Sequence, residues 1–324
     1  MQADAGREAT LPRIFSRPDD DKREWTYVFN CGGETRFGQD PSVYQARSLS
    51  LSNTLAKECA RRNIPLVDFS DGCIYKAPSS STISGGGCKE DAPLKPWLKI
   101  SKFKHQAEEG LLDLAKSSGL RYVSLRLAHV YGAYDAGFLA RGLCLARVYE
   151  AQGRELKWLW GKDLRVNTVH IQDVCSAAWL AASWAAAHAP KPTDTLADRA
   201  FNIVDNGDTS QGTLATLFGS TFNITTGFQG TLVSSFARFN LDSVVDDVNE
   251  DILQPWADLL KEKGIKDGGP LSPYMEKELL KDCDLCLNSG RAQKELGWKV
   301  AREKLDGAAV KEVLDSYRKM GWWP

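Results

Sequence analysis

Short apolar, β-prone runs alternate with helical segments along most of this chain. The first run, residues 25–31 (WTYVFNC), ends at Gly32-Gly33, which is typical of a buried strand that stops at a tight turn. Residues 43–62 then show helical spacing, and residues 65–70 (PLVDFS) predict a second strand. A strand, a helix and a parallel strand form a βαβ unit. The pattern therefore predicts an α/β fold whose parallel sheet is covered on both faces.

The alternation continues to about residue 204. Helices are predicted over residues 102–118, 138–151 and 173–188, and strands over residues 121–131, 155–160 and 200–204. The polar, glycine-rich residues 78–87 lack the strand and helix that flank a phosphate loop, so they are interpreted as a surface loop. From about residue 208 the pattern is mainly helical. We expect a leader over 1–24, an α/β domain over 25–207 and a helical lobe over 208–324.

The charge balance of the 324 residues limits the partners of this protein. Lysine and arginine number 41 against 42 acidic residues, a net charge of -1, so no global field attracts nucleic acid or anionic lipid. No signal peptide or membrane-spanning apolar run is recognisable. We therefore expect a cytosolic protein that acts on a small molecule, with neither a nucleic acid nor a membrane partner.

The eight cysteines are spread over a long chain, which favours reduced thiols over a disulfide framework. Cys283 and Cys286 form the only CxxC motif. Because no second CxxC or paired histidine motif supplies two further ligands, an ordinary loop pair is favoured over a zinc site, and no metal is predicted.

Four short motifs occur in an ordered series along the chain. They are residues 69–75 (FSDGCIY) with Ser101-Lys102 after them, residues 125–132 (LRLAHVYG), residues 167–174 (NTVHIQDV) and residues 289–298 (SGRAQKELGW). This series resembles the extended short-chain dehydrogenases/reductases of the NAD-dependent epimerase/dehydratase family. The resemblance implies a Rossmann-like doubly wound parallel sheet with a smaller, mainly helical C-terminal lobe for substrate. It also implies NAD or NADP as cofactor and a nucleotide sugar or similar molecule as substrate.

The chain departs from the family pattern at its start. Family members open with a strand and a Gly-x-x-Gly-x-x-Gly turn that binds the dinucleotide pyrophosphate, and nothing before Trp25 can play that part. On this alignment the first βαβ portion is missing, together with the residue that selects NAD or NADP. Gly32-Gly33 then matches the end of the family's fourth strand, beside the nicotinamide ribose. The run at 25–31 is left with an apolar edge that must be capped or paired.

The second departure is chemical. The family places its catalytic tyrosine four residues before the lysine, where this chain has Leu98, and leucine cannot transfer a proton. Asp71 stands where many relatives have a catalytic serine or threonine, although Ser70 lies next to it. Tyr75 is a further, less favoured candidate for the missing phenol.

The resemblance assigns the candidate site residues. Lys102 and Ser70 are the catalytic candidates, and Gly32, Gly33, Lys102 and His129 are the cofactor-binding candidates. A solvated lysine and a core histidine are the alternatives for Lys102 and His129. Arg165 is the candidate for a substrate phosphate, although the family's arginine stands one residue later, at Val166.

Three functions stay open. The protein is an oxidoreductase, epimerase or dehydratase; or a catalytically inactive pseudoenzyme that senses a ligand or binds a partner; or an isomerase or cyclase that holds its substrate in a reactive shape. The resemblance also implies a homodimer formed through the helices at 43–62 and 102–118.

Overall fold

A four-stranded parallel sheet organises the first half of the fold. It is seen in a computed structural model that describes residue 6, residues 8–16 and residues 25–324. The strand order is β1 (Val28–Asn30), β2 (Leu66–Asp71), β3 (Tyr122–Leu127) and β7 (Ala200–Ile203), and every neighbouring pair is parallel. The prediction of an α/β, Rossmann-like parallel sheet is confirmed.

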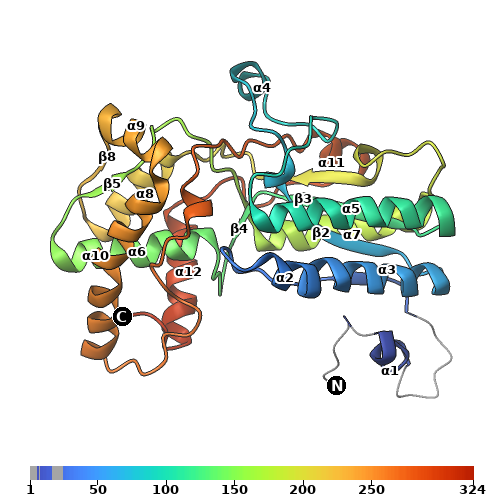
Figure 1. The fold of residues 1–324 in the computed structure, drawn as a ribbon, viewed down its shortest axis with the longest axis horizontal. Helices are drawn as coiled ribbons and strands as arrows, with labels where there is room; N and C mark the ends of the chain where they lie inside the picture. The colour runs from blue at the N-terminus through green and yellow to red at the C-terminus, as the bar shows by residue number, and fades with distance from the viewer. Residues whose placement is uncertain (1–5, 7, 17–24) are drawn as a thin grey trace. The chain divides into compact units, whose positions relative to one another are not determined.

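Helices cover both faces of this sheet. On one face α3 (Ser50–Arg62) and α5 (Lys99–Ser118) lie side by side (Figure 1). Val28 of β1 packs against the apolar cluster on that face. The next residue, Phe29, stacks on Trp179 of α7 (Ile171–Ala187), with ring centroids 6.4 Å apart. Because successive side chains of a strand point to opposite faces, these two contacts place α3 and α7 on opposite sides of β1.

The predicted strand at 121–131 is two strands. It divides at Ala128 into β3 and β4 (His129–Tyr131), and β4 pairs with β6 (Thr168–His170) instead of joining the four-stranded sheet. The Ala128 N–H donates to the carbonyl of Ile203 in β7, whereas the His129 N–H donates to the carbonyl of Asn167. The chain therefore changes hydrogen-bonding partners between two consecutive residues.

Two further predictions needed adjustment. The helix predicted over 43–62 is a continuous series of α2 (Pro41–Tyr44), a π-helical segment (Gln45–Leu49) and α3. The predicted loop at 78–87 contains a short helix, α4 (Ser80–Ser84), whose first turn is capped because the Ser79 hydroxyl accepts the Thr82 N–H at 3.2 Å. Within the predicted leader, α1 (Leu11–Phe15) buries Leu11 and Phe15, and residues 1–5, 7 and 17–24 lie outside the described residues.

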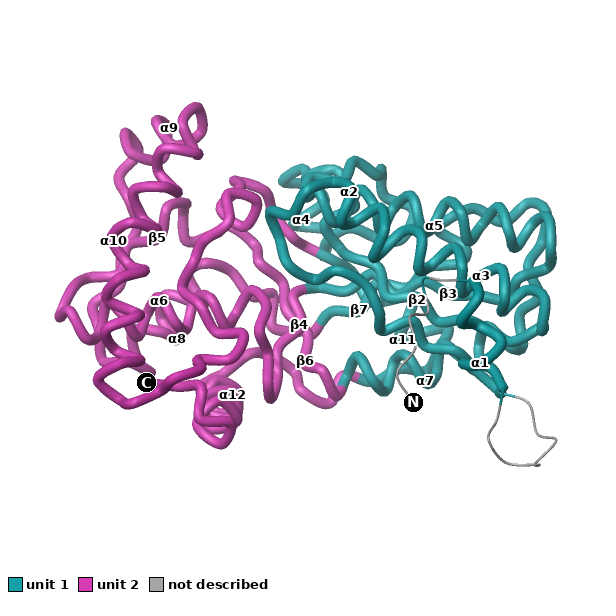
Figure 2. The backbone as a smooth tube through the Cα atoms, turned by 60° about the horizontal axis from the view of Figure 1, so that its bottom comes forward, with its two compact units in different colours: residues 1–128, 173–204, 287–299 teal, residues 129–172, 205–286, 300–324 magenta. Residues whose placement is uncertain are grey.

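The chain divides into two compact units that interleave along the sequence (Figure 2). Unit 1 comprises residues 1–128, 173–204 and 287–299, and unit 2 comprises residues 129–172, 205–286 and 300–324. Unit 1 contains the four-stranded sheet. Unit 2 contains the β4–β6 pair and a second pair, β5 (Leu156–Trp158) with β8 (Thr226–Phe228). The predicted division into a leader, a cofactor-binding domain from residue 25 and a substrate lobe from residue 208 stays a prediction.

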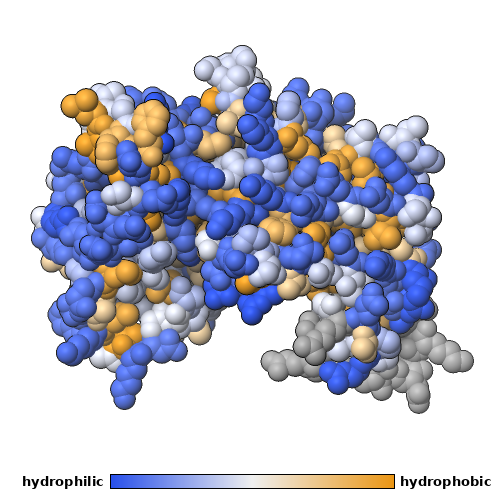
Figure 3. All heavy atoms as spheres, in the orientation of Figure 1, coloured by the Kyte–Doolittle hydropathy of each residue, from blue (hydrophilic) through white to orange (hydrophobic). Residues whose placement is uncertain are grey.

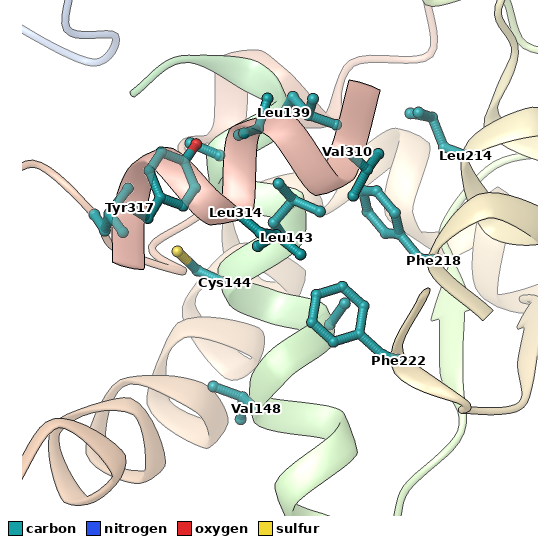
Figure 4. Close-up of a cluster of buried hydrophobic side chains, with 14 of the residues drawn as sticks. Leu139, Leu143, Cys144, Val148, Leu214, Phe218, Phe222, Val310, Leu314 and Tyr317 are labelled. Atoms are coloured by element: carbon teal, nitrogen blue, oxygen red, sulfur yellow. The ribbon is translucent and has the colours of Figure 1, made fainter. Parts of the chain in front are cut away.

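Helices build the core of unit 2. They are α6 (Phe138–Gln152), α8 (Gln211–Phe222), α10 (Leu241–Glu262) and α12 (Gly307–Lys319). Their buried side chains interdigitate in one cluster (Figure 4), which includes Leu143, Val148, Phe218, Phe222, Val310 and Leu314. Burial of this apolar surface is the main stabilising contribution to the unit.

Not all apolar side chains are buried. Leu232 and Phe239 of α9 (Thr231–Phe239) are each 88% exposed, and apolar atoms gather over this helix (Figure 3). In the parts of the chain that the structure describes, no helix combines the length and the apolar character needed to cross a membrane.

Candidate functional site

The carboxyl end of β2 carries a buried hydroxyl that has no protein partner. Ser70 is 5% exposed, and its Oγ forms no hydrogen bond with the described residues. A buried hydroxyl without a partner costs about 1–3 kcal/mol. Ligands of parallel α/β sheets bind outside the carboxyl ends of the strands, so this hydroxyl is well placed to bind one.

Asp71, the next residue, is held by two hydrogen bonds. Its Oδ1 accepts the Cys73 N–H at 2.8 Å, which caps the short 3-10 helix Gly72–Ile74. Its Oδ2 accepts the Ser101 hydroxyl at 2.5 Å, which joins the end of β2 to the first turn of α5. Asp71 therefore fixes the position of α5 relative to β2.

The start of α5 presents two lysines in different surroundings. Lys102 is exposed, and its side chain forms no hydrogen bond or ion pair with the described residues. The Lys104 ammonium donates to the carbonyl of Phe69 in β2 at 2.7 Å. Two residues along an α-helix correspond to a rotation of about 200°, so the two side chains leave the helix on opposite sides. Lys104 is the ammonium at the strand end, and the sequence interpretation missed it.

A signal for Lys104 existed in the sequence. Positions 101, 104, 108, 111 and 115 follow the spacing of one helical face, and the structure buries Ser101, Glu108, Leu111 and Ala115 on it. Leu98, at the position of the family's tyrosine, is the N-cap of α5 and only 1% exposed. It packs in the core and has no group that could transfer a proton.

Gly32 and Gly33 follow β1 at the same edge of the sheet. A Cβ on Gly32 would lie 2.6 Å from Leu51 Cδ2, and Gly33 has a φ of +128° that side chains rarely adopt. The Asn30 side chain supports this turn, because its Oδ1 accepts the Gly32 N–H and its Nδ2 donates to Asp68. The backbone conformation thus requires glycine at position 33, and a side chain at position 32 would displace the tip of Leu51.

Tyr75 is committed to a structural network. Its hydroxyl donates to Asn202 Oδ1 at 2.7 Å and accepts from Arg126 Nη1 at 2.8 Å. Burial raises the pKa of this phenol well above its usual value. The Tyr75 hydroxyl is therefore not available to transfer a proton in place of the missing tyrosine.

The remaining two candidates belong to unit 2. His129 stacks on Phe138 with ring centroids 4.1 Å apart, and burial lowers the pKa of the imidazole to about 4. Arg165 Nε donates to Asp208 Oδ2 at 2.8 Å, and its Nη1 donates to the carbonyl of Asp163. His129 is thus neutral near pH 7, and Arg165 is paired with a carboxylate.

Unit 1 brings Gly32, Gly33 and Ser70 to the carboxyl edge of one sheet, with Lys104 bound at the end of β2. These residues fit the nicotinamide ribose end of a dinucleotide, which needs close backbone approach, a hydroxyl and a cation. The pyrophosphate end has no counterpart here, because the described residues contain no Gly-x-x-Gly-x-x-Gly turn between a strand and a helix.

The fold is shared with solved structures at low identity. UDP-glucose 4-epimerase of Thermus thermophilus, solved with NAD, is 16% identical, with a TM-score of 0.63; the match covers 98% of this chain and 83% of that chain. WbmG of Bordetella bronchiseptica, solved with NAD and UDP, is 17% identical, with a TM-score of 0.61, covering 100% of this chain and 81% of that one. RMD of Pseudomonas aeruginosa, solved with NADPH, is 14% identical, with a TM-score of 0.64, covering 99% and 87%.

No curated protein matches the sequence of this chain. The family model for the NAD dependent epimerase/dehydratase family matches residues 19–202, which is more than half of the chain. The match includes the four-stranded sheet up to Asn202, the glycine turn after β1 and the segment from Ser70 to Lys104. This chain therefore belongs to the NAD-dependent epimerase/dehydratase family.

Proposed function

We propose that this protein binds a nicotinamide dinucleotide, NAD or NADP, and acts as an oxidoreductase or epimerase on a nucleotide sugar. The observation that carries the proposal is the buried, unpartnered hydroxyl of Ser70 at the carboxyl edge of the sheet. The solved neighbours with NAD, UDP and NADPH support the choice of ligands.

Three groups of this chain would hold the cofactor. Ser70 would donate or accept a hydrogen bond with its free hydroxyl, and Lys104 would place a positive charge at the end of β2. The turn at Gly32-Gly33 would admit the ligand close to the backbone. When bound, the nicotinamide supplies a hydride acceptor or donor.

The proton transfer that accompanies such chemistry needs a group other than the family's tyrosine. Leu98 cannot supply it, and the Tyr75 hydroxyl is engaged by Asn202 and Arg126. Loss of a positioned general acid or base costs about 10²- to 10⁴-fold in rate. We therefore expect slow turnover relative to family members that keep the tyrosine.

A thermal-shift titration of the full chain tests the binding step, with NAD, NADH, NADP, NADPH, UDP and UDP-glucose as probes. A ligand at 100 times its dissociation constant adds about 2.7 kcal/mol of stability. We expect a clear rise with at least one dinucleotide, reduced in Ser70→Ala and in Lys104→Ala. Lys102→Ala is the matched control, because that side chain is exposed two residues earlier on the same helix.

The result also separates the alternatives. If Lys102→Ala abolishes the shift and Lys104→Ala does not, the lysine assigned from the family motif is the right one. If no dinucleotide stabilises a cooperatively folding sample, the proposal fails and a non-catalytic binding role takes its place. Interconversion of UDP-glucose and UDP-galactose, followed by chromatography of the sugars, then tests the epimerase step.

We also propose that the protein forms a homodimer through α3 and α5. These helices lie side by side on one face of the sheet of unit 1, which gives a broad two-helix surface (Figure 1). Light scattering of the purified chain gives the mass directly, and a monomeric mass at micromolar concentration would contradict the proposal.

A further inference from the structure

Two exposed thiols stand out among the eight cysteines. Cys31, directly after β1, and Cys175, in α7, are both exposed and both belong to unit 1. The other six are buried or only partly exposed: Cys59, Cys73, Cys88, Cys144, Cys283 and Cys286. Reagents in solution can therefore reach Cys31 and Cys175 most readily.

Ring contacts bring the two segments together. Phe29 of β1 stacks on Trp179 of α7 with an interplanar angle of 12°, and Tyr27 contacts the same indole edge-on at 5.8 Å. Cys31 lies two residues after Phe29, and a tight turn keeps it near that residue, because its N–H donates to the Phe29 carbonyl at 3.0 Å. Cys175 lies four residues before Trp179, which is one turn along the same helix face.

Electrostatics agree with this proximity. Burial and the negative charge of the Cys175 thiolate raise the pKa of Cys31, whereas the Lys104 ammonium lowers it. Lys104 is itself fixed by its hydrogen bond to Phe69. Cys31 thus lies within electrostatic range of both Cys175 and Lys104, at the edge of the sheet where Gly32-Gly33 follows β1.

We propose that Cys31 and Cys175 form a dithiol site that reacts with a low-molecular-weight disulfide and closes into an intramolecular disulfide. One protein thiolate attacks a sulfur of the incoming disulfide and releases one thiolate, leaving a mixed disulfide. The second protein thiolate attacks the protein sulfur of that mixed disulfide and releases the other thiolate. Two protein thiols are oxidised by two electrons, the incoming disulfide is reduced to two thiols, and these take up the two protons.

The bond would tie the segment after β1 to α7. In a disulfide the two Cα atoms lie about 4.4–6.8 Å apart, so the bond would fix Cys31, next to the Gly32-Gly33 turn, against α7. Oxidation would then restrict the backbone at the proposed cofactor edge. The dithiol reaction does not depend on whether a dinucleotide binds there.

Peptide mapping of the full chain tests the site. The protein is incubated with oxidised glutathione, its remaining thiols are alkylated, and it is digested with trypsin without reduction. The tryptic peptides that contain Cys31 and Cys175 carry no other cysteine. We expect a single disulfide-linked pair of these two peptides. In Cys31→Ser and in Cys175→Ser the link is lost, and one glutathione adduct remains on the other cysteine.

Cys283→Ser is the matched control and should keep the Cys31–Cys175 link, because it removes a partly exposed thiol elsewhere in the chain. Far-ultraviolet circular dichroism of each variant checks that it is folded. The proposal is overturned by separate glutathione adducts on both cysteines without a link, by a link between other cysteines only, or by no reaction at either position.

Discussion

Arg126 of β3 and Glu108 of α5 form an ion pair that solvent does not reach. The guanidinium Nη2 lies 2.7 Å from Glu108 Oε2, and the side chains are 0% and 1% exposed. Arg126 also donates to Tyr75 and to the carbonyl of Glu90, and Tyr75 donates to Asn202 of β7. One buried cation thus connects α5, two strands and the segment that follows β2.

Removal of one partner of this pair should be strongly destabilising. We expect Glu108→Gln to lower the free energy of unfolding by about 3–5 kcal/mol, because it leaves the Arg126 charge buried without its counterion. Urea denaturation followed by circular dichroism measures the change. Glu109→Gln is the control, since Glu109 is 54% exposed and should cost under about 1 kcal/mol. Equal effects in the two variants would contradict a buried pair.

Replacement by alanine should lower the stability at Ser52 but not at Ser70. Ser52 is 2% exposed and its hydroxyl donates to Asp68 at 3.0 Å, so Ser52→Ala should cost about 1 kcal/mol of stability. Ser70 has no partner to lose, so Ser70→Ala should leave the free energy of unfolding unchanged or raise it by about 1 kcal/mol. Urea denaturation compares both variants with the parent. A Ser70→Ala loss as large as that of Ser52→Ala would mean that its hydroxyl is satisfied.

His129 should make the stability depend on pH. Its pKa falls from 6.5 to about 4 on folding, so the unfolded chain binds more protons between these values. The contribution of neutral, buried His129 to the free energy of unfolding is therefore complete above about pH 6.5. It is lost as the pH falls toward 4. Between pH 7.5 and pH 5 the free energy of unfolding should fall less in His129→Gln than in the parent protein.

Urea denaturation at the two pH values measures this difference. His188→Gln, which removes an exposed histidine, is the control for the loss of one imidazole. An identical pH dependence in the parent and in His129→Gln would show that the imidazole titrates normally in the folded state.

Replacement by phenylalanine should destabilise the protein more at Trp298 than at Trp179. The Trp298 indole N–H donates to the carbonyl of Asp173 and to Ser176, each at 3.1 Å, and the side chain is 1% exposed. Trp298→Phe removes both hydrogen bonds and should cost about 1–3 kcal/mol. Trp179 is 61% exposed, and Trp179→Phe should cost less than about 1 kcal/mol. Thermal unfolding of the two variants measures both losses of stability. A larger loss in Trp179→Phe would contradict a stabilising role of the buried Trp298 hydrogen bonds.

The sequence predicted the elements of unit 1 well, because their periodicity is local. Residues 65–70 and 200–204 predict strands that the structure places at Leu66–Asp71 and Ala200–Ile203. The division of residues 121–131 at Ala128 could not be predicted. Both halves are apolar, and their partners, Ile203 and Asn167, are far away in the sequence.

The candidate site was predicted in part. Gly32-Gly33 and Ser70 are placed at one sheet edge, as their positions after strands implied. The roles of Lys102, His129 and Arg165 stay predictions. Lys104 was missed because a motif fixes a spacing, whereas the rotation of α5 against β2 depends on the bond between Asp71 and Ser101.

The interleaving of the two units affects how the protein can be made. The chain passes from one unit to the other after residues 128, 172, 204, 286 and 299. Domains generally fold as they leave the ribosome, N-terminal part first. Here unit 1 lacks its last segment until residue 299 has been synthesised, when nearly the whole chain exists. This last segment contains α11 (Gly290–Glu295), which packs against β7, so β7 lacks that neighbour until late in translation. No single truncation can release either unit intact.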